Sequence, residues 1–199
     1  GYYSSNFMNL QTKSRVFAPY KMFEFGGTKL ALVGVTTPES FTKSTPAYFQ
    51  DANGNYIYGF SEGGDGQELY NQVQSAVDEA RGQGAQYVIL VGHLGQNGVT
   101  PAWSSTAVLA NTAGIDACID GHSHETYERT VSNAAGEKVI LVQTGTKLNA
   151  IGKVVIEPAT GNISSGLVTD YAEKDPAASA FIESLMADFS DTLNQVVAS

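Results

Sequence analysis

Apolar and polar positions follow two different periods along the chain. Near-continuous apolar runs of strand length cover residues 86–92 and 115–120, and such runs are typical of strands buried on both faces. Residues 67–84 instead carry apolar side chains at helical spacing and close on glycine, which predicts a helix. The pattern also predicts a helix over 103–114 and strands over 2–7, 21–25, 28–37, 138–145, 151–158 and 161–171.

The last part of the chain predicts a long amphipathic helix, from Asp175 to Val197. Asp175 is a helix-capping residue and Pro176 suits the first helical position. One apolar stripe follows the helix and must be buried against something; its members are Phe181, Leu185, Phe189, Leu193 and Val196. We therefore expect two parts, a body over 1–172 and this helix over 173–199.

The order of the predicted elements indicates the fold class. A strand–helix–strand order that continues into several more strands predicts a layered α/β fold with a mixed sheet. The glycine pair Gly26-Gly27 predicts a tight hairpin between the strands on either side of it. The 199 residues are enough for a sizeable core.

Charge, hydropathy and cysteine content argue against several kinds of partner and structure. The net charge of −9, with only 11 Lys and Arg, argues against a nucleic-acid partner. No apolar run reaches the ~18 residues that a membrane span needs. The single cysteine, Cys118, excludes an internal disulfide framework and is expected to be a buried, inert thiol.

Two glycine-containing segments resemble ligand loops without meeting their requirements. Residues 51–62 place oxygen-bearing side chains like a calcium loop, but Tyr56 stands where that loop needs glycine. We expect a hairpin over Asn53-Gly54 instead. Residues 61–68 lack the ending of a phosphate-binding loop and predict a helix-entry loop.

All three histidines of the chain directly follow predicted buried strands. His93 ends one apolar run, and His122 and His124 follow the other. Ligands of open α/β sheets bind beyond the carboxyl ends of the strands, and neutral imidazole is the commonest protein metal ligand. If residues 122–124 are extended, both side chains of the pair point to the same side. The pattern therefore predicts a metal site formed by the three imidazoles.

The stretches VILVGHLG (88–95) and GIDACIDGHSHE (114–125) make this prediction more specific. In this order they resemble signature blocks of the calcineurin-like metallophosphoesterases, most closely the 5′-nucleotidases. That resemblance extends over nearly the whole chain and implies a mixed-sheet α/β/β/α sandwich, present here as a partial domain.

The resemblance also implies a cofactor and its ligands. The family's site holds two divalent metal ions, such as zinc or manganese, which clamp a phosphate and activate water. Carried over to this sequence, His93 and His122 would bind one ion and His124 the other. Residues expected to orient the imidazoles are Asp120, Ser123 and Gln143. Bound cations would also explain how an acidic protein acts on anionic substrates.

The family's earlier blocks, Asp-x-His, Gly-Asp and Gly-Asn-His-Asp/Glu, are not found in the chain, and neither is its substrate-binding domain. We therefore expect part of a secreted 5′-nucleotidase of nucleotide catabolism, with weak metal binding and no activity in isolation. We also expect it to associate with a second copy or with the N-terminal half. Two alternatives remain open: a 2′,3′-cyclic-nucleotide phosphodiesterase or UDP-sugar hydrolase of the same superfamily, and a non-catalytic surface module.

Overall fold

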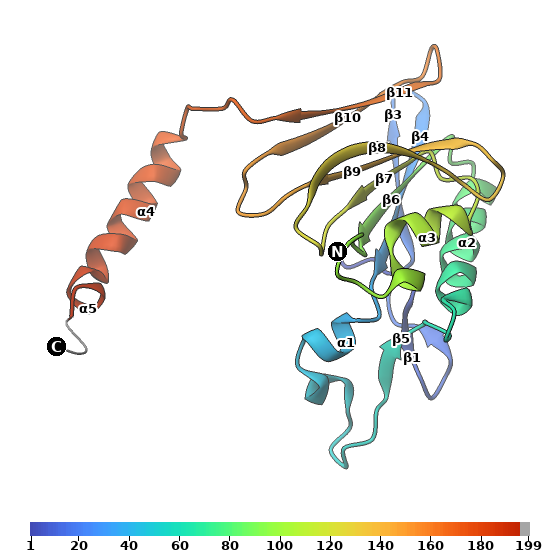
Figure 1. The fold of residues 1–199 in the computed structure, drawn as a ribbon, viewed down its shortest axis with the longest axis horizontal. Helices are drawn as coiled ribbons and strands as arrows, with labels where there is room; N and C mark the ends of the chain where they lie inside the picture. The colour runs from blue at the N-terminus through green and yellow to red at the C-terminus, as the bar shows by residue number, and fades with distance from the viewer. Residues whose placement is uncertain (196–199) are drawn as a thin grey trace. The chain divides into compact units, whose positions relative to one another are not determined.

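The computed structural model describes residues 1–195, which fall into two compact units, Gly1–Val168 and Thr169–Ser199. The first unit is built on a six-stranded mixed sheet with the order β3-β4-β6-β7-β9-β8 (Figure 1). Its strands are β3 (Tyr20–Phe25), β4 (Thr28–Thr36), β6 (Tyr87–His93), β7 (Ala117–Asp120), β8 (Thr126–Ser132) and β9 (Lys138–Thr144).

The four central strands, β4, β6, β7 and β9, are parallel, and the outer strands β3 and β8 are antiparallel to their neighbours. The predicted apolar runs form these central strands, as expected for strands covered on both faces. The fold class predicted from the sequence is therefore confirmed as a mixed α/β fold.

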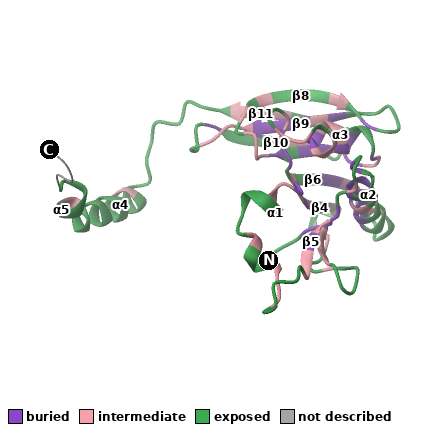
Figure 2. Cartoon of the chain, turned by 60° about the horizontal axis from the view of Figure 1, so that its bottom comes forward, coloured by how far each residue is buried: buried purple, intermediate pink, exposed green. Residues whose placement is uncertain are grey.

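Helix α2 (Gln67–Gly82) turns its apolar face into the core beside the sheet, and α3 (Ser105–Ala110) contributes Val108 and Leu109 to the same core. Buried residues concentrate in β4, β6, β9 and α2 (Figure 2). The cysteine Cys118 is fully buried as predicted, and burial raises its thiol pKa well above the usual value.

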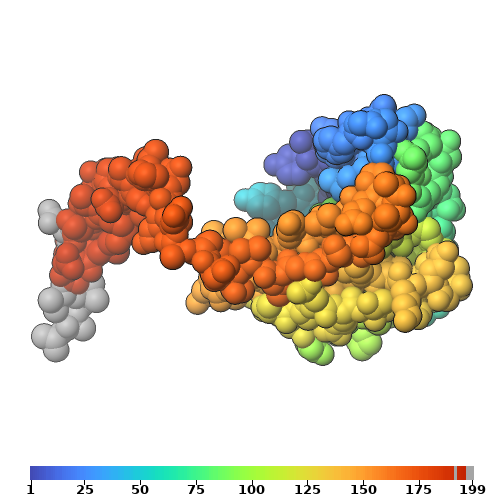
Figure 3. Space-filling view, turned by 90° about the horizontal axis from the view of Figure 1, so that it is seen from above, coloured from blue at the N-terminus to red at the C-terminus, as the bar shows by residue number. Residues whose placement is uncertain are grey.

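Smaller elements surround the sheet. The strands β1 (Phe7–Asn9), β2 (Ser14–Arg15) and β5 (Tyr58–Phe60) form a separate antiparallel sheet. The short helices are α1 (Ser40–Lys43), η1 (Pro46–Phe49) and η2 (Pro101–Trp103). The hairpin of β10 (Ile151–Glu157) and β11 (Asn162–Val168) contacts β9, and Figure 3 shows it as an orange band beside the yellow atoms of β8.

Both hairpin predictions are confirmed. Gly26 and Gly27 form the β3–β4 turn with positive φ angles of 57° and 83°, which glycine adopts without steric cost. The Asn53-Gly54 turn is closed by a bridge between Gln50 and Tyr56, so the calcium-loop pattern belongs to a hairpin. The Asp51 carboxylate accepts hydrogen bonds from the Asn53 and Asn55 backbone N–H groups.

Two element predictions were wrong in their bounds, and one strand was not predicted. The first strand begins at Phe7 rather than residue 2, because Tyr3 makes only an isolated bridge. Helix α3 covers six residues, because Ser104 caps it and pushes its start beyond Trp103. Strand β8 was not predicted, because TYERTVS is a mostly exposed edge strand without an apolar run.

The second unit, described by itself, contains α4 (Pro176–Asp188) and α5 (Ser190–Leu193). Asp175 caps α4 through a 2.8 Å bond from the Ala178 N–H, and Pro176 opens the helix, both as predicted. The helix is not continuous, because α4 ends before Phe189 and α5 follows. The predicted stripe is exposed at Phe181, Leu185, Phe189 and Leu193, and Val196 and Val197 lie outside the described residues.

Gly66 gives a prediction about stability. It precedes α2 with φ +83°, and a Cβ there would lie 2.6 Å from the Ala102 carbonyl oxygen and 2.6 Å from the Tyr70 hydroxyl. Gly66→Ala should destabilise the fold by about 2 kcal/mol or more, because left-handed strain and overpacking each cost about 1–3 kcal/mol. Gly64→Ala is the matched control, since nothing lies within 4 Å of its Cβ position. Urea unfolding of both variants measures the effect, and equal stabilities would contradict it.

Candidate functional site

The carboxyl ends of the parallel strands bring the candidate residues to one edge of the sheet. Strand β4 ends at Thr36, which lies opposite His93 at the end of β6. Strand β7 ends at Asp120, two residues before His122. The Thr37 N–H donates a 2.9 Å bond to the His93 carbonyl, which ties the loop after β4 to the end of β6. This edge is where open α/β sheets place their ligands.

His93 and His122 meet at this edge. The Nε2 atom of His93 lies 3.1 Å from Nδ1 of His122, and the ring centroids are 4.8 Å apart. The backbone of Gly121 lies beside the His93 ring, since a Cβ built on this glycine would lie 3.4 Å from its Nδ1. The structure therefore brings together two of the three predicted imidazoles with ring nitrogens facing each other.

The loop that carries His122 and His124 is not extended. Both residues have positive φ angles, 77° and 57°, so the expectation that strand alternation aligns their side chains was wrong. The left-handed region is unfavourable for residues with a side chain, costs of order 1 kcal/mol or more, and is concentrated at functional sites. His124 is exposed, and its interaction with His93 is electrostatic.

The three residues expected to orient the imidazoles, Asp120, Ser123 and Gln143, form hydrogen bonds to the backbone of the surrounding loops. Asp120 is 8% exposed and accepts bonds from the Leu94 and Gly95 N–H groups at 2.9 and 3.0 Å. The Gln143 amide donates to the Gly121 carbonyl and accepts from an N–H in the same loop. Ser123 accepts from a backbone N–H after β6. These contacts fix the positions of the loops after β6 and β7.

The carboxylate that does contact an imidazole was missed in the sequence. Glu39 Oε2 lies 3.1 Å from His122 Nε2, with both side chains only 11–12% exposed. Oε1 accepts bonds of 2.6 and 2.9 Å from the Thr100 N–H and hydroxyl, and Lys43 Nζ lies 2.7 Å from Oε2. The available signal was that Glu39 follows the β4 strand, whose end lies at the same sheet edge.

The surroundings set the charge of these groups. Burial alone would raise the pKa of Glu39, but hydrogen bonds from Lys43, His122 and Thr100 outweigh it and lower that pKa to about 2. Partial desolvation of its ring lowers the pKa of His93, although the residue is exposed. The imidazoles of His122 and His124 add to this lowering, and Asp120 opposes it. Both effects favour an ionised Glu39 and a neutral His93, which is the metal-binding form of imidazole.

The side chains near His93 and His122 meet only part of what a metal ion requires. Among the described residues, no group of three or more His, Cys, Asp and Glu side chains is arranged to hold an ion. The facing nitrogens of His93 and His122 nevertheless fit two ligands of one cation. With metal–nitrogen bonds of 2.0–2.1 Å, two nitrogens on a tetrahedral zinc lie about 3.3 Å apart, close to the 3.1 Å observed here.

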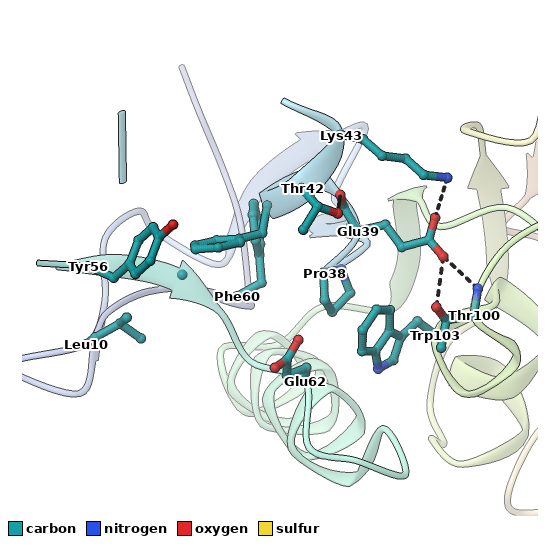
Figure 4. A pocket seen from close by; sticks show the side chains of 12 residues that line it. Leu10, Pro38, Glu39, Thr42, Lys43, Tyr56, Phe60, Glu62, Thr100 and Trp103 are labelled. Atoms are coloured by element: carbon teal, nitrogen blue, oxygen red, sulfur yellow. Dashed lines mark hydrogen bonds and ion pairs between the residues drawn. The ribbon is translucent and has the colours of Figure 1, made fainter. Parts of the chain in front are cut away.

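A cavity of about 650 Å³ lies beside Glu39, and Figure 4 shows the contacts of Glu39 with Lys43 and Thr100 at its edge. Its wall also contains Phe60 and Trp103. Glu39 therefore contacts His122 and also lines an aromatic cavity. In the part of the chain that the structure describes, no helix is long and apolar enough to cross a membrane.

The chain is similar in sequence to two known bacterial proteins. No family model matches it. It is 22% identical over 190 residues to the trifunctional nucleotide phosphoesterase protein YfkN of Bacillus subtilis. The aligned region covers 90% of this chain and 12% of YfkN. The chain is 38% identical over 48 residues to the protein UshA of Yersinia enterocolitica. This shorter aligned region covers 24% of this chain and 9% of UshA.

Comparisons of structure confirm the fold. The sulfate thiohydrolase SoxB of Thermus thermophilus matches with a TM-score of 0.73 and 24% identity, over 95% of this chain and 32% of its own. A 5′-nucleotidase precursor, also from Thermus thermophilus, matches with a TM-score of 0.72 and 20% identity, over 98% of this chain and 39% of its own. The chain thus spans roughly a third of these structures, and nearly all of it adopts their fold.

Proposed function

We propose that this chain, which has the fold of 5′-nucleotidase-type metallophosphoesterases, supplies part of a metal-dependent site that hydrolyses nucleotide phosphate esters. His93 and His122 are ligands of one divalent cation in this proposal, and His124 is a ligand of a second. The observation that carries it is the 3.1 Å approach of the His93 and His122 nitrogens at the carboxyl edge of the parallel strands.

The chemistry follows from what such a site supplies. Bound divalent cations neutralise charge on a phosphate and make an attacking water more acidic. The chain's own residues prepare the site: the lowered pKa of His93 favours its neutral ring, and Asp120 holds the backbone at Leu94 and Gly95 just after it. In this proposal the bridging carboxylates belong to a further segment, since among the described residues no group of three or more His, Cys, Asp and Glu side chains is arranged to hold an ion.

Support for a nucleotide substrate comes from one sequence relative, the trifunctional nucleotide phosphoesterase YfkN. A location outside the cytoplasm and pairing with an N-terminal half belong to the same proposal. The runner-up substrates are 2′,3′-cyclic nucleotides and UDP-sugars, and the same assay distinguishes them from nucleoside monophosphates.

The test is the release of products in the presence of manganese, separated by chromatography: adenosine and phosphate from AMP, 3′-AMP from 2′,3′-cyclic AMP, and UMP and glucose 1-phosphate from UDP-glucose. The 199-residue chain is assayed alone and mixed with a separately made segment that carries the Asp-x-His and Gly-Asn-His blocks. We expect near-zero release by the chain alone and cation-dependent release from AMP by the mixture. Cation-dependent turnover by the chain alone would contradict the need for a second segment. A mixture that associates but stays inactive on all three substrates would favour the non-catalytic module.

A further inference from the structure

Glu39 stands out because its carboxylate contacts the ring of a proposed ligand, although it belongs to none of the motifs found in the sequence. The Oε2–Nε2 distance of 3.1 Å joins two side chains that are both nearly buried. The other nitrogen of the same ring, Nδ1, faces His93 Nε2. Each nitrogen of His122 therefore has one defined neighbour, a carboxylate on one side and the other imidazole on the opposite side.

The Glu39 carboxylate is itself held in place on both oxygens. The Thr100 N–H and hydroxyl donate to Oε1, and Lys43, one turn later in the chain, contacts Oε2. Figure 4 shows these contacts converging on the carboxylate from the segment after β4 and the segment before η2. A side chain with so many partners has little freedom to rotate, so the position of the oxygen at His122 is fixed.

We infer that Glu39 is a positioning residue, which accepts the Nε2–H of His122 and thereby leaves the lone pair of Nδ1 directed toward His93. This inference rests on the proposed function, in which that lone pair binds the cation. A neutral imidazole carries one proton, so a hydrogen bond at one nitrogen decides which nitrogen remains free. Carboxylates that orient metal-binding histidines act in this way.

The backbone gives a physical reason why His122 needs such a partner. With φ at 77°, this residue occupies a region that disfavours side chains, so contacts with the surrounding structure have to hold it there. The hydrogen bonds of Asp120, Ser123 and Gln143 go to the surrounding backbone and to polar side chains. Glu39 is therefore the carboxylate in position to select the tautomer of His122.

Substitution Glu39→Gln tests the inference, because an amide has one oxygen where the carboxylate has two. Two Thr100 donors, one of them a backbone N–H, require that oxygen, whereas the Lys43 side chain is 54% exposed and can turn away into solvent. The amide N–H₂ therefore turns toward His122 Nε2 and donates to it. We expect His122 to change from the Nε2–H tautomer to the Nδ1–H tautomer. Long-range proton–nitrogen NMR measures the tautomer of His122 directly. The full chain is used, without metal and under mildly alkaline conditions. Glu79→Gln is the matched control, since Glu79 pairs with Arg15 on another surface.

Glu39→Asp gives a second variant that keeps the charge but shortens the side chain, and we expect it to leave a mixture of tautomers. A wild-type His122 in the Nδ1–H form, or an unchanged tautomer in a folded Glu39→Gln variant, would overturn the inference. A manganese titration of the His93 signal then separates the two proposals: the apparent affinity should fall about 10–100-fold in Glu39→Gln. An unchanged affinity would also overturn the inference, whereas a wild-type chain without any response would overturn the proposed function.

Discussion

His122→Ala should remove cation binding at His93, and in an active phosphoesterase it should lower turnover at least about 100-fold. The structure places the His122 Nδ1 atom 3.1 Å from the His93 Nε2 atom, so the substitution leaves one nitrogen where two faced each other. A bound metal contributes several kcal/mol of charge stabilisation in the transition state, and each increment of about 1.36 kcal/mol is tenfold in rate.

The chain has three histidines, so its imidazole Cε1–H region contains three NMR signals. Paramagnetic manganese should broaden the His93 and His122 signals together in the wild type, and should leave the His93 signal sharp in His122→Ala. His124→Ala keeps the facing pair and should preserve the His93 response. Undiminished broadening of His93 in the His122→Ala variant would refute the shared ligand role.

Leu141→Ala should destabilise the first unit by about 2–5 kcal/mol. Leu141 lies on β9 between β7 and β8, is 0% exposed, and belongs to the single core cluster shared with α2 and α3. Large-to-small core substitutions lose the burial of the removed atoms and leave a cavity that the neighbours fill only partly.

Leu193→Ala is the matched control, because it makes the same chemical change at a side chain that is 62% exposed. Its effect should stay within about 0.5 kcal/mol, as is usual for surface positions. The midpoints of urea unfolding, followed by circular dichroism and by tryptophan fluorescence, measure both variants. Equal midpoints would show that the β9 core contributes no more than the surface does.

The central fold could be predicted because its signals are local and strong. The apolar runs that became β6 and β7, the helical period of α2 and the Gly26-Gly27 hairpin each determine an element within a short window. Strand β8 could not be predicted in this way. Its charged and polar residues face solvent, and it is a strand because β9 offers it hydrogen-bonding partners.

The site was predictable only in part, for a similar reason. His93 and His122 could be predicted as site residues because they follow strands that are parallel, and parallel strands end at one edge of the sheet. Glu39 lies 83 positions from His122 in the chain, and a single carboxylate forms no sequence motif from which this contact could be predicted. The left-handed backbone at His122 and His124 also depends on the loop's tertiary hydrogen bonds, so the sequence suggested an extended pair instead.

The most direct measurement of the central claim is the anomalous diffraction of crystals of this chain soaked with zinc. We expect a zinc peak bound by His93 Nε2 and His122 Nδ1, at the roughly 2.0–2.1 Å typical of zinc–nitrogen bonds. Glu39 should stay hydrogen-bonded to the other nitrogen of His122. Zinc bound elsewhere on the chain, with the His93 and His122 nitrogens still in contact and no peak between them, would contradict the claim.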